Sequence, residues 1–200
     1  MASPGGVSSG AMTRDPEWLL SQLRDIPDFP TPGIVFKDLT PLLGNPEAFR
    51  FTVDAMVEHA AELPRGSEED GDGLLSAGVD KVVGIEARGF TFAAAVSYQL
   101  SAGLVPVRKP GKLPYKTVTE TYDLEYGTDS LEIHQDALEP GQSVYVIDDV
   151  LATGGTAAAT CRLVESLGAR VAGLAFVVEL GFLDGRAKLA DYDVHSLLRL

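Results

Sequence analysis

The sequence predicts an α/β fold with a mostly parallel, twisted sheet and helices on both faces. The apolar run Val144–Ile147 has the character of a strand buried on both faces, and a helical pattern follows it from Ala157 to Leu167. The same order recurs in the strand pattern Lys81–Ile85 and the apolar helical pattern from Phe90 to about Leu100. Alternating strands and helices are typical of parallel sheets, whose ligands bind beyond the carboxyl ends of the strands.

Composition and charge restrict the class of protein. A chain of 200 residues, 45% of them hydrophobic, suits one domain with one core. The net charge of −13 argues against nucleic acid or an anionic membrane as a partner. The single cysteine, Cys161, excludes an intramolecular disulfide, fits a reducing cytoplasm and is best explained as a small core residue. We find neither an apolar run long enough to span a bilayer nor a signal-peptide pattern.

The first 41 residues divide into a tail, a helix and an irregular segment. Residues 1–14 are rich in Gly, Ser and Ala and are expected to form a disordered tail. Asp15-Pro16-Glu17 is a typical helix start. The proline-rich segment Asp28–Pro41 is expected to be irregular and, from its residues alone, is interpreted as a loop at the edge of the core. The helix is predicted to be short and amphipathic, with an apolar face of Trp18, Leu19, Leu23 and Ile26.

The remaining elements follow from the apolar pattern. A second helix is predicted from Asn45-Pro46-Glu47 to about Leu63, and the acidic stretch over 64–78 fits a solvated loop better than a cation site. The later elements are a strand Leu104–Arg108, a hairpin of Thr119–Glu125 and Ser130–His134, a strand Arg170–Leu180, and a short helix and final strand within Phe182–Leu200.

The stretch that follows Val144–Ile147 has the composition of an anion-binding loop. Asp148 and Asp149 come where the strand is expected to end, and a short loop then leads into the helix. The free backbone N–H groups and the positive end of the helix dipole suit a phosphate at the start of this helix. The glycines let the backbone approach the phosphate closely, and the threonine hydroxyls can donate further hydrogen bonds to it. The acid pair can accept from sugar hydroxyls or face a divalent cation. Together they describe a site for a ribose 5-phosphate; the alternative is a solvated strand end before a capped helix. The loop residues are Ala152, Thr153, Gly154, Gly155 and Thr156.

Four basic residues predict a second anion site. Arg88 at the start of the helix Phe90–Leu100 is unfavourable for the helix dipole, which an anion beside it would explain. Arg108, Lys109 and Lys112 lie just past the end of another strand in an otherwise acidic chain. Pairing of Arg88 with a surface acid, and an ordinary solvated face for the other three, are the alternatives.

Residues 144–156 resemble the phosphoribosyl pyrophosphate (PRPP) binding motif of the type I phosphoribosyltransferases. Further segments resemble the adenine phosphoribosyltransferases in the same order, and the similarity extends from about residue 15 to the C-terminus. These segments are residues 24–41, 84–90, 106–114 and 124–127. The resemblance implies the type I phosphoribosyltransferase fold as a single domain over 15–200, with a small hood (15–41) and a flexible catalytic hairpin loop (115–134).

The resemblance also implies a reaction, in which adenine and PRPP give AMP and pyrophosphate with Mg²⁺ carried by substrate oxygens and water, without a direct protein ligand. Asp148 and Asp149 would hold the ribose, the loop Ala152–Thr156 the 5-phosphate, and Glu125 the purine proton. Without the resemblance, Glu125 would be interpreted as a surface glutamate and Leu180 as a core residue. The implied catalytic residues are Glu125 and Tyr126, the pyrophosphate ligands Arg88, Arg108, Lys109 and Lys112, and the base ligands Val35, Phe36, Lys37 and Leu180.

Three positions bear on how closely the family pattern is kept. Glu86 and Ala87 stand where the family often has Asp and Ser or Ala, and Ala152 stands where enzymes for 6-oxopurines often carry an acid. The latter favours adenine as the base. The family further implies a cytoplasmic homodimer that can share an arginine between subunits. The alternatives are another purine phosphoribosyltransferase, a PRPP-sensing regulator without catalysis, or a generic nucleotide-binding domain.

Overall fold

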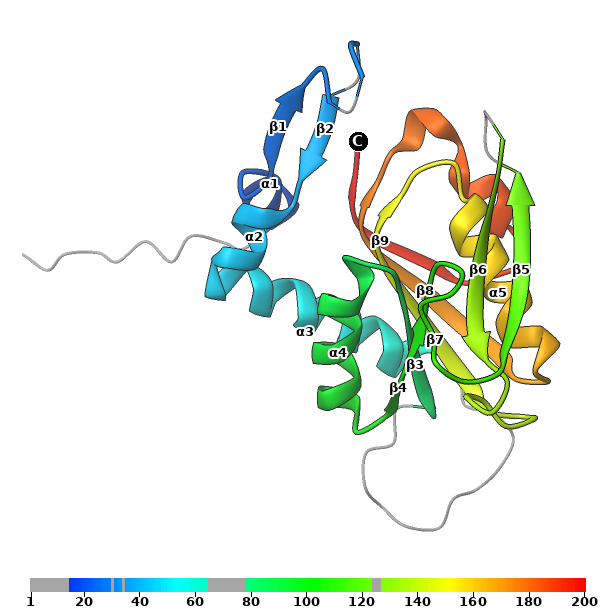
Figure 1. Cartoon of the computed structure of the whole chain (residues 1–200). Coiled ribbons are helices and arrows are strands. Elements are labelled where there is room, and N and C mark those ends of the chain that lie inside the picture. Colours follow the sequence, from blue (N-terminus) through cyan, green and yellow to red (C-terminus); the bar gives the residue numbers. More distant parts are fainter. Residues whose placement is uncertain (1–14, 30, 34, 65–77, 124–126) are drawn as a thin grey trace, which may run out of the picture. The chain divides into compact units, whose positions relative to one another are not determined.

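The structure, a computed structural model, describes residues 15–29, 31–33, 35–64, 78–123 and 127–200 (Figure 1). The predicted disordered tail and nearly all of the predicted acidic loop lie outside these residues. The chain divides into two compact units, Met1–Phe51 and Thr52–Leu200.

The first unit contains a short helix and a two-stranded antiparallel sheet. Helix α1 begins as predicted, because a side-chain oxygen of Asp15 accepts a hydrogen bond from the backbone N–H of Trp18 (2.9 Å). The elements of this unit are α1 (Pro16–Leu20), β1 (Arg24–Pro27), β2 (Val35–Asp38), α2 (Thr40–Gly44) and the start of α3 (Pro46–Glu62).

The predicted extent of the first helix is wrong. Helix α1 ends at Leu20, and Ile26 lies in strand β1 opposite Phe36. Pro27 disfavours helical geometry at Ile26, and strand pairing gives the segment another set of partners. The Asp25 carboxylate, for example, accepts a hydrogen bond from Lys37 Nζ across the strands (2.7 Å). Helical spacing therefore overlooked a hairpin whose second strand lies in the proline-rich segment.

The second unit is built on a five-stranded sheet in which all neighbours are parallel. The strand order is β4-β3-β7-β8-β9, so the chain crosses back to place β7 at the centre. The predicted parallel sheet is confirmed. Its strands are β3 (Lys81–Ile85), β4 (Gly103–Val107), β7 (Ser143–Leu151), β8 (Arg170–Glu179) and β9 (Val194–Arg199).

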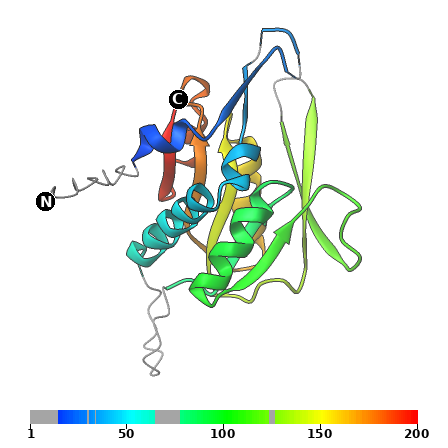
Figure 2. The ribbon, with the colours of Figure 1, turned by 90° about the vertical axis from the view of Figure 1, so that its left-hand side faces the viewer.

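Helices cover both faces of this sheet, as predicted (Figures 1 and 2). Helix α4 (Gly89–Leu100) packs closely on β3, since a Cβ built on Gly84 would lie 2.8 Å from Ala93 Cβ. Helix α5 (Gly155–Ser166) covers the other face, together with a hairpin formed by β5 (Thr117–Asp123) and β6 (Thr128–His134). Two short 3₁₀ helices, η1 (Gly181–Leu183) and η2 (Gly185–Leu189), lead from β8 towards β9.

Alternation along the central strand explains both layers. Val144 and Val146 belong to one buried cluster that includes Leu163 of α5 and Leu131 of the hairpin. Tyr145 is fully buried, and its hydroxyl lies 2.8 Å from His59 Nδ1 on α3. Burial of each such large apolar side chain contributes about 1.5–3 kcal/mol, so the sheet anchors a site built at its edge. None of the helices within the described ranges combines the length and the hydropathy of a membrane-spanning helix.

Candidate active site

The acid pair lies inside the central strand and not beyond it. Strand β7 continues to Leu151, which pairs with Glu179 of β8, so the predicted strand end at Asp148 is wrong. The ten-residue strand β8 supplies partners along this whole stretch, and Asp148 itself lies opposite Phe176. Pairing with β8 therefore holds the chain at Asp148 and again at Val150, directly before and after Asp149.

The loop after β7 opens directly onto the N-terminus of α5. Gly154 caps the helix with φ of +76°, a left-handed conformation that favours glycine, and the helix begins at Gly155, two residues earlier than predicted. The first backbone bond of the helix runs from Ala158 N–H to the Gly154 carbonyl (3.0 Å). The N–H groups before it have no partner one turn back, and they converge with the positive end of the helix dipole. This is a geometry for binding a phosphate.

Gly185, a residue that the sequence did not single out, supports this loop from behind. A Cβ built on Gly185 would lie 2.0 Å from the Ala152 carbonyl oxygen and 2.8 Å from the Gly154 nitrogen. A Cβ on Gly154 would in turn lie 2.3 Å from the Gly185 carbonyl oxygen. The two backbones are in contact, and neither position has room for a side chain. The signal in the sequence that could have pointed to Gly185 is its position directly after Asp184. In the structure, Asp184 has a positive φ of +51°.

An ion pair between a buried glutamate and a partly exposed arginine holds Gly185 in place. The Glu179 side chain is 3% exposed and accepts hydrogen bonds from Arg186, the residue after Gly185 (2.5 and 3.1 Å). Arg186 also donates to the Val194 carbonyl (2.7 Å), so η2 is tied to both β8 and β9. The hydrogen bond from Arg186 lowers the pKa of Glu179 and outweighs the effect of burial. Sequence reasoning missed this pair, because nothing local marks Glu179 as buried.

The structure brings Arg88 and the acid pair together. Arg88 Nε forms an ion pair with Asp149, whose residue is only 5% exposed. The Asp149 N–H donates to a side-chain oxygen of Asp148 (2.9 Å). A Cβ on Gly89 would lie 2.8 Å from the same Asp148 carboxylate, so the start of α4 approaches β7 as closely as a backbone can. The predicted ribose and pyrophosphate ligands therefore share one edge of the sheet.

Asp148 is the carboxyl of this pair whose pKa the surroundings shift. Burial, and then the charge of Asp149, raise the pKa of Asp148 well above its ordinary value. Two carboxylates on adjacent residues repel each other, and Arg88 neutralises the charge of Asp149 directly. The site can accept hydrogen bonds from a diol, and the carboxylate of Asp149 lies within it as the partner of Arg88.

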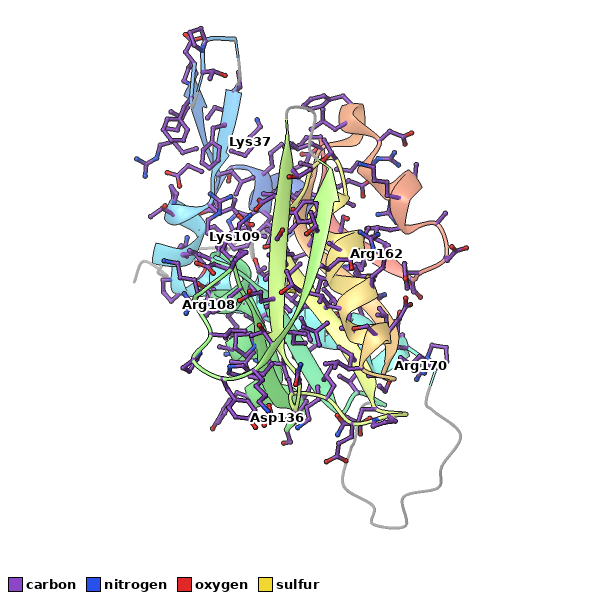
Figure 3. All side chains as sticks on the ribbon, turned by 45° about the vertical axis from the view of Figure 1, so that its right-hand side comes forward. Lys37, Arg108, Lys109, Asp136, Arg162 and Arg170 are labelled. Atoms are coloured by element: carbon purple, nitrogen blue, oxygen red, sulfur yellow. The ribbon has the colours of Figure 1, made fainter. Side chains whose placement is uncertain are left out.

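Glu86 organises the basic cluster at the end of β4. Its carboxylate accepts the Lys109 backbone N–H (2.9 Å) and pairs with Arg108 Nε (3.2 Å). The Lys109 N–H bond is the main cause of a lowered pKa for Glu86, and it outweighs burial. A backbone bridge between Arg108 and Glu132 also joins this end of β4 to the hairpin, beside which Arg108 and Lys109 lie (Figure 3). The glutamate at position 86 therefore shapes the cluster.

The three cations of this cluster have different partners. Arg108 pairs with Glu86, and Lys109 Nζ forms an ion pair with Asp129 of the hairpin. For the ammonium of Lys112 we find no carboxylate partner among the described residues; its carbonyl accepts from Arg108 (3.2 Å).

The predicted base ligands lie in both units. Val35 on β2 is 53% exposed, the Phe36 ring packs edge-on against Phe29 at 5.2 Å, and Lys37 pairs with Asp25. Leu180 belongs to the second unit, where its N–H donates to the Leu151 carbonyl (2.9 Å) at the end of the central strand. The predicted catalytic residues Glu125 and Tyr126 lie outside the described residues.

Comparison with known proteins agrees with this geometry. A family model described as the phosphoribosyl transferase domain matches residues 55–196. The adenine phosphoribosyltransferase of Desulfitobacterium hafniense is 54% identical over 177 residues, covering 88% of this chain and 94% of that one. The adenine phosphoribosyltransferase of Thermotoga maritima is 54% identical over 176 residues, covering 88% and 94% of the two chains.

Solved structures give the same result. The crystal structure of adenine phosphoribosyltransferase from Thermoanaerobacter pseudethanolicus superposes with a TM-score of 0.83 at 46% identity, covering 92% of this chain and 99% of that one. The Saccharomyces cerevisiae enzyme, complexed with an imino-altritol bisphosphate and adenine, superposes with a TM-score of 0.80 at 40% identity, covering 91% and 97%.

A parallel sheet whose central strand carries an acid pair before a glycine loop is an architecture of the α/β class suited to a nucleotide or sugar phosphate, and the chain belongs to the phosphoribosyltransferase family. Within that family it groups with the adenine phosphoribosyltransferases.

Proposed function

We propose that this protein transfers the phosphoribosyl group of PRPP to adenine, giving AMP and pyrophosphate. The observation that carries the proposal is the alignment of three features at one sheet edge: the loop Ala152–Thr156, the acid pair Asp148–Asp149 and the cation Arg88. They match, in order, a 5-phosphate, a ribose diol and a pyrophosphate. The names of relatives at 54% identity support adenine as the acceptor.

The sugar phosphate is expected to be fixed before it reacts. N–H groups at the start of α5 hold the 5-phosphate, with the hydroxyls of Thr153 and Thr156 as further donors. Asp148 and Asp149 accept the ribose hydroxyls and lie beneath the anomeric carbon as it gains positive charge. Catalysis is then mainly positioning and charge stabilisation, because the substrate itself carries the leaving group.

The pyrophosphate is expected to leave towards the cations. Arg88 and Lys112 contact it directly, with Arg108 and Lys109 adding positive charge in the same cluster. Mg²⁺, when bound, would neutralise further charge on the phosphate oxygens. The ion is expected to be carried by substrate oxygens and water, because Mg²⁺ gives up its hydration shell reluctantly.

The base is expected to meet Val35, Phe36, Lys37 and Leu180. Glu125, with Tyr126 beside it, would manage the purine proton as N9 attacks the sugar, which is the role of a general acid–base. Water must be excluded at this stage, since it would hydrolyse PRPP.

We further propose a cytoplasmic homodimer that binds no nucleic acid. The acidic net charge and the single, buried Cys161 support the location and the lack of nucleic acid. The exposed side chains of Tyr98 (87%) and Leu104 (46%) offer apolar surface for association. Sedimentation of the full chain tests the oligomeric state.

The experiment that tests the function measures product formation from PRPP and Mg²⁺ with adenine, hypoxanthine or guanine. Turnover with adenine alone, slowed at least 100-fold in Glu125→Ala while PRPP still binds, is the expected result. Preference for another base would contradict the base pocket and leave the PRPP site intact. Binding of PRPP without any turnover would make the protein a PRPP sensor.

A further inference from the structure

A chain of four side chains connects the basic cluster to the phosphate loop. Lys109 Nζ pairs with Asp129, and the Tyr122 hydroxyl donates to the same carboxylate oxygen at 3.3 Å. The Tyr122 hydroxyl also lies 3.1 Å from Thr156 Oγ1 in the first turn of α5. Tyr122 is 6% exposed and stands opposite Asp129 in the register of the hairpin. Residues far apart in the sequence thus meet in one hydrogen-bonded series.

The ion pair at one end of this series is fully charged near neutral pH. The hydrogen bond from Lys109 lowers the pKa of Asp129 despite burial. Burial acts to lower the pKa of Lys109, but the hydrogen bond and charge of Asp129, with a contribution from Tyr122, raise it. The charge of Lys109 is therefore already matched by a neighbouring carboxylate.

The directions of the hydrogen bonds follow from the donors available. An ionised carboxylate only accepts, so Tyr122 donates its single proton to Asp129. Tyr122 must then accept from Thr156, whose hydroxyl proton is thereby directed and whose rotamer is held. The orientation of a side chain in the phosphate loop depends on an ion pair at the end of another strand.

We infer that Lys109 is a positioning residue for the 5-phosphate loop, acting through Asp129 and Tyr122 on Thr156, while Lys112 is the lysine that meets pyrophosphate. This inference rests on the proposed function, and it divides a basic cluster that the sequence presents as one unit. Lys112 differs from Lys109 in its carboxylate neighbours: Lys109 forms an ion pair with Asp129, whereas the charge of Lys112 acts on Glu86 and we find no ion pair of its ammonium among the described residues.

Binding of ribose 5-phosphate and binding of pyrophosphate, measured separately, distinguish the role of Lys109 from that of Lys112. Ribose 5-phosphate probes the loop, pyrophosphate with Mg²⁺ probes the cations, and calorimetric titration of the full chain gives a Kd for each. Lys109→Met is expected to raise the Kd of ribose 5-phosphate about tenfold and that of pyrophosphate less than threefold, because it leaves the Asp129 carboxylate unpaired next to the loop. Lys112→Met is expected to show the reverse pattern.

Tyr122 and Asp129, which lie between Lys109 and Thr156 in the series, provide further variants that test the inference independently of Lys109→Met. Tyr122→Phe removes only a hydroxyl and is expected to raise the Kd of ribose 5-phosphate about fivefold. Replacing both ends of the ion pair, Lys109→Met with Asp129→Leu, is expected to bind ribose 5-phosphate more tightly than Lys109→Met alone, since no charge is left unpaired. The control is Tyr192→Phe, which removes a hydroxyl bond to the Glu165 carboxylate (2.8 Å) outside the site and is expected to change neither Kd.

Each result decides the inference. It is overturned if Lys109→Met weakens pyrophosphate as much as ribose 5-phosphate, or if Tyr122→Phe binds ribose 5-phosphate as the wild type does. Should Lys109→Met fail to fold, judged by thermal unfolding, the Tyr122→Phe result decides alone. Failure of the wild type to bind either ligand would instead contradict the proposed function.

Discussion

The two strand–loop–helix units of the sheet build their anion sites by different means. The loop between β7 and α5 relies on backbone: Gly154 opens the helix and Gly185 supports it from behind. The loop between β3 and α4 relies on side chains, because Arg88 occupies the cap position and pairs with Asp149, while Glu86 holds Arg108. A site built from closely packed backbone does not tolerate an added side chain. A site built from charged side chains can lose one charge by substitution while its backbone keeps its shape.

The largest effect is expected where the backbone site has no space. Gly185→Ala places a Cβ 2.0 Å from the Ala152 carbonyl oxygen, so the loop must move. We expect a loss of about 3 kcal/mol in the free energy of unfolding and at least a 100-fold rise in KM for PRPP. Urea unfolding and steady-state kinetics measure both quantities.

Gly44→Ala is the matched control for this substitution, since a Cβ there meets nothing within 4 Å. It is expected to change stability by less than about 0.5 kcal/mol. Wild-type kinetics in Gly185→Ala would show that the loop does not depend on this contact.

The side-chain site is expected to lose function before it loses stability. Arg88→Gln leaves Asp149 without its cation, but because the Arg88 side chain is 48% exposed, we expect only about 1 kcal/mol of destabilisation. The kcat/KM for PRPP is expected to fall about 100-fold, since a charge facing the leaving group is removed. Arg88→Lys should recover little of it, as an ammonium lacks the planar fork of a guanidinium. Full activity in Arg88→Lys would contradict the role of the fork.

The smallest effects are two pH dependences of opposite sign. The pKa of Asp148 is raised in the folded protein, so its proton stabilises the fold below the ordinary Asp pKa of about 4, and this is lost as the pH rises through the raised value. The pKa of Glu86 is lowered, so its ionised form stabilises the fold above the ordinary Glu pKa of about 4.3, and this is lost as the pH falls.

Chemical unfolding between about pH 3 and pH 8 measures these slopes as differences from matched variants. The stability of the wild type relative to Asp148→Asn is expected to decrease as the pH rises, and its stability relative to Glu86→Gln to decrease as the pH falls. Slopes of equal sign would contradict the opposite pKa shifts of Asp148 and Glu86.

The sequence predicted the parts of the molecule that local pattern determines. The strand at Lys81–Ile85 has the predicted bounds, and the capped start at Asp15, the parallel order and the glycine loop before α5 are also confirmed. Each depends on periodicity, a cap or a turn within a few residues.

What the sequence did not predict depends on contacts between distant segments. Ile26 pairs with Phe36 in a hairpin, although its spacing in the sequence suggested a helix. Strand β7 continues beyond the apolar residues Val144–Ile147 because β8 pairs with the residues that follow. The phosphate loop is supported by Gly185 and bonded to Tyr122, and Thr156 and Tyr122 are 34 positions apart. The resemblance named the ligands of the site without showing what holds them in place.

The contact between Gly154 and Gly185 has a consequence for protein engineering. The motif from Val144 to Thr156 is contiguous and looks transferable, yet its shape is completed by Gly185, which lies outside the motif. A graft of the motif into another α/β scaffold must bring the η2 turn and its Glu179–Arg186 clamp with it. The transferable unit is a pair of segments, and a library that varies one of them should hold the other fixed.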